Sequence, residues 1–323
     1  MRVFVTGATG FIGIHTVAAL RARGHEAVCL VRDLRKTAAF AAPAPELVEG
    51  DLGDTAALAR GCDGADAVVH LAGLTAARSR RELFAVNADG TRAIVDVVRA
   101  TRGRVARVVH VSSLAAAGPA SFGAPLTGTE PAHPVSDYGR SKLAGETHVR
   151  ELHVPWVILR PPAVYGPHDR EFLRLFKLAA LGVAPLFGGG TQRLSMVYAP
   201  DLAQAIVTCL EHMPAAAAYY PAHPETTTAR ALVESIGTAL ATRTRVLPLP
   251  RALVRPICFV SGTAAKLARR ATLLSSDKAN ELLADAWTCS PASLTAAVGW
   301  QAATDLAAGL RETGEWYRAA GWL

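Results

Sequence analysis

The chain has 323 residues, half of them apolar and 19% charged, an ordinary globular composition with ample material for a core. The net charge is +7, but the basic residues are scattered and only 6% of the residues are aromatic, so we expect no nucleic-acid partner. A small ligand that carries phosphate is sufficient to account for some of the positive charge. The five cysteines lack metal-ligand or redox spacing, so we expect no metal site and a reducing compartment.

The first half of the chain alternates short apolar runs with amphipathic stretches. The first strand is predicted at residues 3–5, directly after the initial methionine, so we expect no signal peptide. Further strands are predicted at 27–31, 46–48, 67–71, 105–111 and 156–159, and helices at 11–23, 56–61, 83–101 and 138–151. This alternation predicts an α/β fold with a doubly wound parallel sheet, whose ligands bind outside the carboxyl ends of the strands.

The second half has a different rhythm. Three consecutive glycines stand at 188–190, a helix is predicted at 202–211, and prolines are frequent between 214 and 256. Segment 252–270 is apolar with basic residues spaced through it. We favour an amphipathic helix or lid packed on the core over an apolar wall for a lipophilic substrate or a membrane-surface segment. No apolar run is long enough to span a bilayer, so we expect a cytoplasmic protein.

Three glycines separate the first strand from the first helix. Gly7 permits a tight turn, Gly10 lets the backbone approach a pyrophosphate, and Gly13 lets the helix pack closely on the sheet. The helix N-terminus then offers N–H groups and the positive end of its dipole to the anion. The spacing Gly-x-x-Gly-x-x-Gly between a strand and a helix therefore predicts a dinucleotide site.

The end of the second strand indicates which dinucleotide binds. An acidic residue there would hold the ribose 2′-hydroxyl of NAD, whereas an arginine favours the 2′-phosphate of NADP. Arg32 follows the strand directly and Lys36 could add a second charge, so we favour NADP(H). In the alternative, NAD(H) binds, Arg32 is a solvated surface residue and Asp33 takes the ribose.

Tyr138 and Lys142 lie one helical turn apart on a shared face. A tyrosine with its ordinary pKa of about 10 is a poor base near neutral pH, but a neighbouring ammonium lowers that pKa. The pair can therefore donate a proton to a ketone oxygen or remove one from an alcohol. Ser112 and Ser113 close the fifth strand, where a hydroxyl can hydrogen-bond the substrate oxygen.

These motifs together resemble the extended short-chain dehydrogenases/reductases, a group that includes nucleotide-sugar epimerases, dihydroflavonol reductases and 3β-hydroxysteroid dehydrogenases. The matching segments are TGATGFIG at 6–13, GDL at 50–52, HLAG at 70–73, NADGT at 87–91, VSS at 111–113, YGRSK at 138–142, LRPPAVYGP at 159–167, VYAPD at 197–201 and GLRETGEWY at 309–317. The resemblance covers nearly the whole chain. We expect a Rossmann NAD(P)-binding domain at 1–166 and a substrate-binding lobe over most of 167–323, with 196–212 packing back on the first domain.

The resemblance also implies roles for individual residues. The catalytic set is Ser113, Tyr138 and Lys142; Ser113 is preferred over Ser112 because the family's serine lies five positions before the glycine that ends its motif, here Gly118. The implied cofactor contacts are Gly7, Thr9, Gly10, Phe11, Ile12, Gly13, Arg32, Lys36, Asp51, Leu52, Leu71, Ala72, Gly73, Asn87, Ser112, Tyr138, Lys142, Pro161, Ala163 and Val164. The expected substrate contacts are Thr75, Ser113 and Arg193.

Three functions fit this set. We favour an NADP(H)-dependent oxidoreductase acting on a ketone or secondary alcohol of a small or lipophilic substrate. The alternative is a nucleotide-sugar epimerase that retains NAD: Arg193 resembles the arginine that such enzymes aim at a diphosphate, although Ala163 stands where many have asparagine. A non-catalytic NADP sensor is a remote alternative, because Tyr138 and Lys142 are intact. No carboxylate accompanies the serine pair, which disfavours a 4,6-dehydratase.

Other conspicuous residues have structural interpretations. His15 and His70 are interpreted as packed or space-filling residues, and Asp201 as a helix cap. The tryptophans at 287, 300, 316 and 322 are interpreted as core anchors. A homodimer is expected because twofold dimers are the commonest closed assemblies, with helices 83–101 and 138–151 as candidate contact faces.

Overall fold

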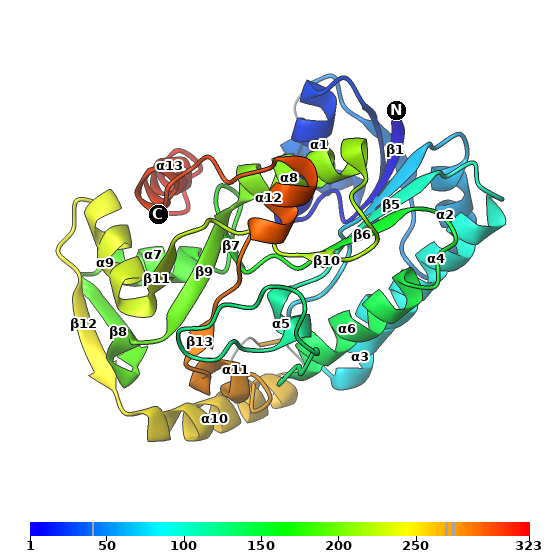
Figure 1. The fold of residues 1–323 in the computed structure, drawn as a ribbon. Helices are drawn as coiled ribbons and strands as arrows, with labels where there is room; N and C mark the ends of the chain where they lie inside the picture. The colour runs from blue at the N-terminus through cyan, green and yellow to red at the C-terminus, as the bar shows by residue number, and fades with distance from the viewer. Residues whose placement is uncertain (41, 269–270, 273–274) are drawn as a thin grey trace.

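The computed structural model describes residues 1–40, 42–268, 271–272 and 275–323 and is built around a large parallel sheet (Figure 1). In spatial order its strands are β10 (Ala218–Tyr219), β6 (Trp156–Leu159), β5 (Arg107–Val111), β4 (Ala67–His70), β1 (Arg2–Thr6), β2 (Glu26–Val31) and β3 (Glu46–Glu49). All neighbouring pairs are parallel. The strand order reverses between β1 and β4, so the predicted doubly wound fold is confirmed.

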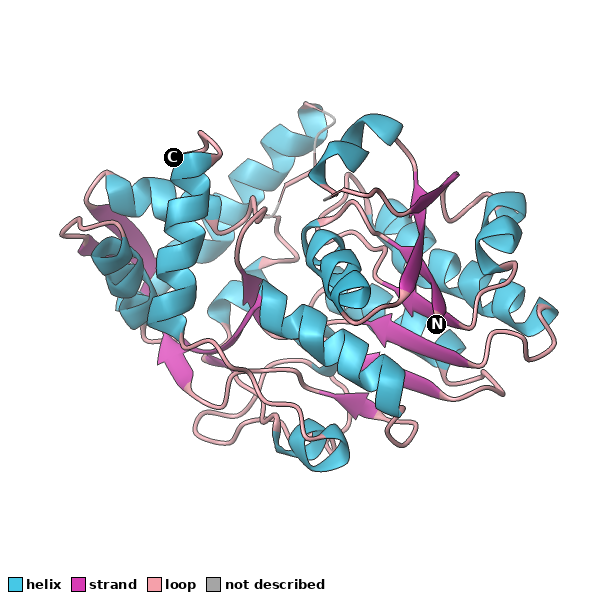
Figure 2. Cartoon of the chain, turned by 90° about the horizontal axis from the view of Figure 1, so that it is seen from above, coloured by secondary structure: helices cyan, strands magenta, loops and turns pink. Residues whose placement is uncertain are grey.

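Helices cover both faces of this sheet (Figure 2). One face carries α1 (Phe11–Ala22) and α8 (Ala199–His212), and the other carries α2 (Thr55–Cys62), α4 (Gly90–Ala100) and α6 (Asp137–Val149). Successive strand residues point to opposite faces, so Phe4 packs with α2 and α4 while Val5 packs with α1 and α8. Burial on both faces explains why the strands are continuous apolar runs.

The prediction of a single helix at 83–101 is wrong, because the structure divides this region into three parts. The structure has α3 (Arg80–Phe84), a π-helical turn at Ala85–Asp89, and then α4. The wide turn buries Asn87, whose side chain binds the backbone of Leu74. An insertion of this kind does not disturb the apolar periodicity, so the sequence pattern does not reveal it.

A seventh strand was not predicted. β10 contains only two residues and pairs in parallel with β6 at the edge of the sheet. Its apolar run is too short to be distinguished from a loop. The segment that enters it comes from α8, which lies against the first half of the chain in the core shared with α1.

A smaller lobe follows the large sheet. Its strands are β7 (Ala163–Tyr165), β9 (Arg193–Tyr198), β11 (Thr226–Thr228) and β13 (Ala286–Trp287) in one sheet, and β8 (Val183–Phe187) with β12 (Arg245–Leu249) in another. Its helices are α7 (Leu173–Ala180), α9 (Ala229–Ala239), α10 (Val254–Leu267), α11 (Ala279–Leu283), α12 (Ala292–Val298) and α13 (Leu306–Ala319). Phe176, Ile236 and Tyr317 are buried together between α7, α9 and α13.

Several residues with structural interpretations can now be placed. Asp201 does not cap α8, whose N-cap is Tyr198; its carboxylate instead accepts hydrogen bonds from the backbone and hydroxyl of Thr304, at 2.9 and 3.2 Å. His15 lies 2.9 Å from the carbonyl oxygen of Pro167. Trp300 is buried in the core shared by α1 and α8. The hydrogen bonds between Asp201 and Thr304 could not be predicted, because the two residues are 103 positions apart in sequence.

The segment 252–270 forms α10, except that 269–270 lie outside the described residues. Val254 and Cys258 pack on α11 as expected of a helix packed on the core. However, Phe259, Val260 and Leu267 are exposed, so that expectation accounts for only one side of the helix. Across the described ranges, no helix is both long and apolar enough to cross a membrane.

Candidate functional site

The turn between β1 and α1 accepts only glycine at two positions. Gly7 has a φ of +74°, and a Cβ there would lie 2.6 Å from the backbone nitrogen of Ala72. A Cβ on Gly13 would lie 2.1 Å from the carbonyl oxygen of Gly7. Gly10 is the N-cap of α1, and no side chain caps this terminus. The first N–H groups of α1 are thus free of side-chain caps, which suits a pyrophosphate.

The residues beside this turn line the same edge of the sheet. Thr9 is half-buried in the turn, and Phe11 and Ile12 begin α1 with half-buried side chains. Leu71 and Ala72 follow β4 directly. The close approach of Ala72 to Gly7 brings the two loops together.

Arg32 is exposed at the carboxyl end of β2. Asp33, the alternative ribose ligand, caps a 3₁₀ turn and accepts hydrogen bonds from the backbone and the guanidinium of Arg35, with Nε 2.9 Å from Oδ1. Its carboxylate is thus engaged locally while Arg32 projects from the strand end. The side chain of Lys36, the second expected cation, lies outside the described part of the structure.

The loop after β3 is placed beside α4. Asp51 is exposed, and its Oδ1 accepts a hydrogen bond from the nitrogen of Gly53 at 2.8 Å. Leu52 is half-buried, and a Cβ on Gly90 would lie 2.6 Å from its Cδ1. Gly90 therefore lets α4 approach this loop closely.

Asn87 holds the loop after β4 in place. Its Oδ1 accepts from the nitrogen of Leu74 at 2.8 Å, and its Nδ2 donates to the carbonyl oxygen of Leu74 and to Ser141, each at 2.9 Å. A Cβ on Gly73 would lie 3.1 Å from Oδ1 of Asn87. The amide of Asn87 is therefore engaged by the protein itself, and it fixes the loop that carries Gly73 and Thr75.

The two adjacent serines at the end of β5 face different surroundings. Ser112 is buried and its hydroxyl donates to Glu146 at 2.7 Å. Ser113 caps α5 (Leu114–Ala117) by accepting a hydrogen bond from the nitrogen of Ala115, and it also hydrogen-bonds the phenol of Tyr138. Ser113 is thus the serine that meets Tyr138, whereas the hydroxyl of Ser112 belongs to a buried ion-pair network.

Tyr138 and Lys142 share one side of α6, and burial shifts their pKa values in opposite directions. Burial raises the pKa of Tyr138 to about 12, with the Ser113 hydrogen bond opposing this shift and Glu281 and Glu171 adding to it. Burial lowers the pKa of Lys142 to about 8, against the attraction of Glu146.

The expected lowering of the tyrosine pKa by Lys142 does not occur in this structure. Nζ of Lys142 donates to the carbonyl oxygen of Val111 at 2.8 Å, while burial holds the pKa of Tyr138 above its ordinary value. The phenol is therefore protonated near neutral pH. This is the state from which a proton donor starts.

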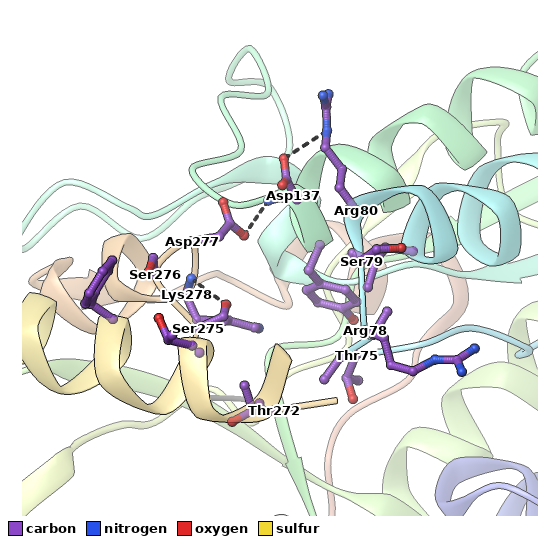
Figure 3. Close-up of a pocket in the computed structure, with 18 residues that line it drawn as sticks. Thr75, Arg78, Ser79, Arg80, Asp137, Thr272, Ser275, Ser276, Asp277 and Lys278 are labelled. Atoms are coloured by element: carbon purple, nitrogen blue, oxygen red, sulfur yellow. Dashed lines mark hydrogen bonds and ion pairs between the residues drawn. The ribbon is translucent and has the colours of Figure 1, made fainter. Parts of the chain in front are cut away.

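A cavity of about 330 Å³ opens beside Tyr138 (Figure 3). Its lining comes from two sides: the loop before α3 and the first turns of α3 and α6 on one, and α10 with the segment before α11 on the other. The lining residues are Thr75, Ala76, Ala77, Arg78, Ser79, Arg80, Leu83, Asp137, Tyr138, Phe259, Gly262, Thr263, Ala265, Thr272, Ser275, Ser276, Asp277 and Lys278. The wall thus combines hydroxyl groups and the charged side chains of Arg78, Arg80, Asp137, Asp277 and Lys278 with alanine, leucine and phenylalanine side chains.

The structure treats the three expected substrate contacts differently. Thr75 lines the cavity and donates to Glu171 at 2.9 Å. Ser113 is not among the lining residues, but it hydrogen-bonds Tyr138, which lines the cavity. Arg193 is not among the lining residues, and its guanidinium donates to Thr226 at 3.0 Å, from β9 to β11.

Pro161, Ala163 and Val164 follow β6. Pro161 is buried, and its carbonyl oxygen accepts a hydrogen bond from the nitrogen of Leu114 at 2.9 Å. Ala163 and Val164 lie half-buried in β7, paired with Met196 and Val197 of β9. This segment therefore connects the end of the large sheet with the second sheet.

Sequence reasoning missed the segment that closes over Tyr138. Nζ of Lys278 lies 4.6 Å from the centre of the Tyr138 ring and forms an ion pair with Glu281 at 2.7 Å. Asp277 accepts a hydrogen bond from the backbone nitrogen of Asp137 at 2.7 Å. These residues follow no motif, and the spacing of Lys278 and Glu281 would indicate only an ordinary helical ion pair.

Comparisons with known proteins place this geometry in context. The profile of the NAD-dependent epimerase/dehydratase family matches residues 3–220. A ceramide reductase of Caulobacter vibrioides is 34% identical over 323 residues, covering 99% of this chain and 96% of that protein. A 4-hydroxy-2-methyl-3-oxo-4-farnesyl-3,4-dihydroquinoline-1-oxide ketoreductase of Stigmatella aurantiaca is 28% identical over 68% of this chain and 67% of its own.

Solved structures share the fold across the whole chain. The UDP-glucose 4-epimerase of Thermus thermophilus, solved with NAD, superposes with a TM-score of 0.80. The alignment covers 99% of this chain and 100% of that one, at 24% identity. At this identity the likeness establishes the common fold.

Proposed function

The chain belongs to the NAD-dependent epimerase/dehydratase family of extended short-chain dehydrogenases/reductases, and from this premise we propose that it is an NADP(H)-dependent reductase of a lipophilic ketone. It is an enzyme of a family whose members include oxidoreductases and epimerases. The observation that carries the proposal is Tyr138: its protonated phenol stands at the wall of the cavity, hydrogen-bonded to Ser113.

The cofactor site fits a nicotinamide dinucleotide. The cradle around Gly7 and Gly13, which a Cβ would fill, would hold the pyrophosphate at the N-terminus of α1. Exposed Arg32 would hold a 2′-phosphate, because Asp33 is engaged by Arg35. Bound there, the cofactor would supply the hydride that reduces the ketone.

The proton would come from the protein. The phenol of Tyr138, with a pKa raised to about 12, carries its proton at neutral pH and would deliver it to the ketone oxygen. The hydroxyl of Ser113 would hydrogen-bond that same oxygen and orient it. Lys142, buried against Val111 in the next turn of α6, would bind the ribose hydroxyls and favour the phenolate left after proton transfer.

The cavity wall supports a lipophilic substrate that carries hydroxyl groups. Leu83 and Phe259 provide apolar surface on opposite sides, while Ser275, Thr272 and Thr75 provide hydroxyls. The relative from Caulobacter vibrioides, similar over almost its full length, is a ceramide reductase. We therefore place the substrate among long-chain ketones with polar groups near the carbonyl.

The epimerase alternative has less support. A nucleotide sugar needs a cation for its diphosphate, and Arg193 was the expected one. Arg193 instead bridges β9 to β11 through Thr226 and stands outside the residues that line the cavity. Arg78 and Arg80 do line it, but each is paired with a carboxylate, that of Glu82 and that of Asp137. Ala163 offers no amide for phosphates. These observations favour the reductase over the epimerase, and the intact Tyr138 and Lys142 disfavour a non-catalytic sensor.

The proposal extends to assembly and location. We propose a homodimer formed through the outer sides of α4 and α6, and a monomer in analytical ultracentrifugation would contradict it. The five cysteines are buried and unpaired, which suits the cytoplasm. We also keep the proposed division into a cofactor domain at 1–166 and a substrate lobe over most of 167–323, with 196–212 on the first domain.

The nucleotide carried by the purified enzyme distinguishes the two reactions. The protein is denatured, any released nucleotide is identified by chromatography, and stripped protein is titrated with NADPH and NADH. A reductase should release little nucleotide, bind NADPH more tightly than NADH and oxidise NADPH with long-chain keto lipids. Stoichiometric NAD that survives purification, with turnover of nucleotide sugars, would contradict the proposal.

A further inference from the structure

The helix α10 is apolar on two opposite sides. Val254 and Cys258 are fully buried against α11. The outer side, which α10 shares with the 3₁₀ turn before it, is also apolar, at positions spaced by four, three and seven residues, and each is exposed. These outer residues are Leu253 in that turn and Ile257, Val260 and Leu267 in α10, of which Val260 is 66% and Leu267 83% exposed. An ordinary surface helix carries polar residues on its outer side, so packing on the core does not explain this composition.

The charged residues of the same segment are all basic. From Arg251 to Ser276 the sequence contains five basic residues and no acidic one. Arg255 is exposed and its guanidinium donates to the amide of Asn280 rather than to a carboxylate. Arg251 is the exception, because it is paired with Asp285. A segment whose exposed side chains are apolar and whose charged residues are all basic is complementary to an anionic lipid surface.

The outer surface of α10 adjoins the cavity. Phe259, Gly262, Thr263 and Ala265 line it, and Phe259 is at the same time 65% exposed. Figure 1 shows α10 along one edge of the molecule, beside α11. A ligand leaving a lipid surface at α10 would therefore reach the cavity without crossing the large sheet.

We propose that the outer side of α10, defined by Leu253, Ile257, Val260 and Leu267, docks on a membrane surface that contains anionic lipid and admits the lipid substrate to the cavity. The docking depends on apolar insertion and on charge, with no span across the bilayer. The choice of a lipid substrate rests on the proposed function, whereas the docking itself rests only on α10.

A second copy of this chain is a weaker occupant for the surface. The chain carries a net charge of +7, and a twofold-related copy docked through α10 would bring together two segments whose charged residues are all basic. Anionic headgroups would neutralise those charges while the apolar side chains enter the boundary with the acyl chains.

Vesicle flotation tests the docking directly. The full-length protein is mixed with vesicles of phosphatidylcholine alone, or of phosphatidylcholine with phosphatidylglycerol, without cofactor or substrate. We expect flotation with the anionic vesicles, weaker flotation with the neutral ones, and a decrease at high salt. Protein that stays at the bottom with both vesicle types would overturn the proposal.

Matched variants assign the binding to α10. The double variant Val260→Asp/Leu267→Asp removes two exposed apolar side chains that do not line the cavity. Its partition onto anionic vesicles should fall by roughly tenfold or more. The control Phe122→Asp/Leu181→Asp makes the same charge change at positions 69% and 76% exposed elsewhere and should bind like the wild type. Equal losses in both variants would contradict the assignment to α10.

Two further measurements separate this inference from the proposed function. If α10 docks, Val260→Asp/Leu267→Asp should keep the wild-type rate on a detergent-dissolved ketone but need a higher concentration of a vesicle-embedded one. Flotation contains no substrate, so absence of all reductase activity would defeat the proposed function and leave the docking standing. Wild-type protein that self-associates, but not the α10 variant, with no vesicle binding would identify a second copy as the occupant and overturn the proposal.

Discussion

Burial acts on Tyr138 and Lys142 in opposite directions, because it disfavours the charged form of each. The pKa of Tyr138 rises to about 12 and that of Lys142 falls to about 8. Both groups are therefore closer to neutrality than in water, although Lys142 still holds its proton at neutral pH. The phenol therefore starts in the protonated form that the reduction of a ketone requires, although its raised pKa makes it a weaker acid until the cofactor and Lys142 stabilise the phenolate.

Coenzyme preference is predicted to reside in Arg32. Replacing it by aspartate, in Arg32→Asp, removes the proposed 2′-phosphate ligand and puts a carboxylate where a 2′-hydroxyl would sit. We expect the ratio of NADPH to NADH affinity to fall by roughly tenfold or more, since a charge-assisted contact contributes about 1.5–3 kcal/mol. The affinities are measured by fluorescence titration.

The exposed Arg104 provides the control for this change. It precedes β5 at the amino end of the sheet, away from the cofactor edge, so Arg104→Asp should leave the selectivity close to that of the wild type. An unchanged selectivity in Arg32→Asp would remove Arg32 from the cofactor site.

The sequence alone did not decide which of the two adjacent serines, Ser112 or Ser113, contacts Tyr138. Residue types and motif order pointed to both Ser112 and Ser113, and only the family pattern separated them. In an extended segment, successive side chains face opposite sides, so Ser112 meets buried Glu146 while Ser113 meets Tyr138. The partner of Ser112 lies 34 residues away in sequence, and no local spacing reveals it.

Between elements, a buried charge network ties α6 to β5 and the end of β6. Glu146 of α6 is fully buried and accepts from Ser112 at 2.7 Å and from Arg160 at 2.8 and 2.7 Å. Arg160 is itself buried. These bonds hold α6, and with it Tyr138, against the carboxyl edge of the sheet.

Loss of the Glu146 charge should destabilise the fold. Glu146→Gln leaves the guanidinium of Arg160 buried without a counter-charge, so we expect the free energy of unfolding to fall by about 3–5 kcal/mol. Urea denaturation measures it. Glu234→Gln breaks an exposed helical pair with Arg230 and should cost about 0.5 kcal/mol or less. A similar small loss in both variants would refute the role assigned to Glu146.

Strands buried on both faces were predictable because their continuous apolar runs leave a clear signal. β1 to β6 appear close to their predicted positions. β10 has two residues, and the π-helical turn preserves the apolar spacing around it. Such features depend on contacts distant in sequence, which is why the π-helical turn at Asn87 and the exposed side of α10 emerge only from the structure.

At the scale of the whole molecule, two buried histidines, His70 and His110, are held neutral beneath the site. His70 bridges Thr6 and Thr91, and its ring stacks on that of His110, with centres 5.1 Å apart. Burial, with Lys142 adding to it, lowers the pKa of His70 to about 3 and holds that of His110 well below its ordinary value. Neither nitrogen of His110 has a hydrogen-bond partner within the described structure.

Acid should therefore destabilise the protein through these histidines. The unfolded chain binds protons at the ordinary histidine pKa of about 6.5, while the folded protein does not, so stability is lost as the pH falls from about 6.5 toward 3. At pH 5 His70, with its pKa lowered to about 3, accounts for about 2 kcal/mol of this loss.

Replacing one histidine isolates its share of the acid effect. His110→Leu should shrink the loss of unfolding free energy between pH 7 and pH 5 in urea titrations, because the variant lacks one group that the unfolded chain protonates and the folded protein does not. The exposed His153 serves as the control, since His153→Leu should leave the loss unchanged. The same pH dependence in His110→Leu and the wild type would show that His110 is not held neutral by the fold.

At the scale of the whole molecule, the fold could be predicted from the sequence, whereas the segments that close the cavity could not. The motifs placed the cofactor loop and the Tyr138–Lys142 pair at one edge of the sheet. The cavity, by contrast, is closed by Lys278 and Phe259, which come from a segment without motifs. The two-domain boundary at 166 stays a prediction, and β10 shows that the chain returns to the first sheet after that point.

The most direct measurement is NADPH oxidation with a long-chain keto lipid by the wild-type enzyme and by Tyr138→Phe, alongside NADPH binding to both. Removing the one hydroxyl should leave NADPH affinity nearly unchanged and reduce turnover by roughly a hundredfold or more. If Tyr138→Phe reduces the lipid at the wild-type rate, Tyr138 does not donate the proton and the proposed reductase mechanism is wrong.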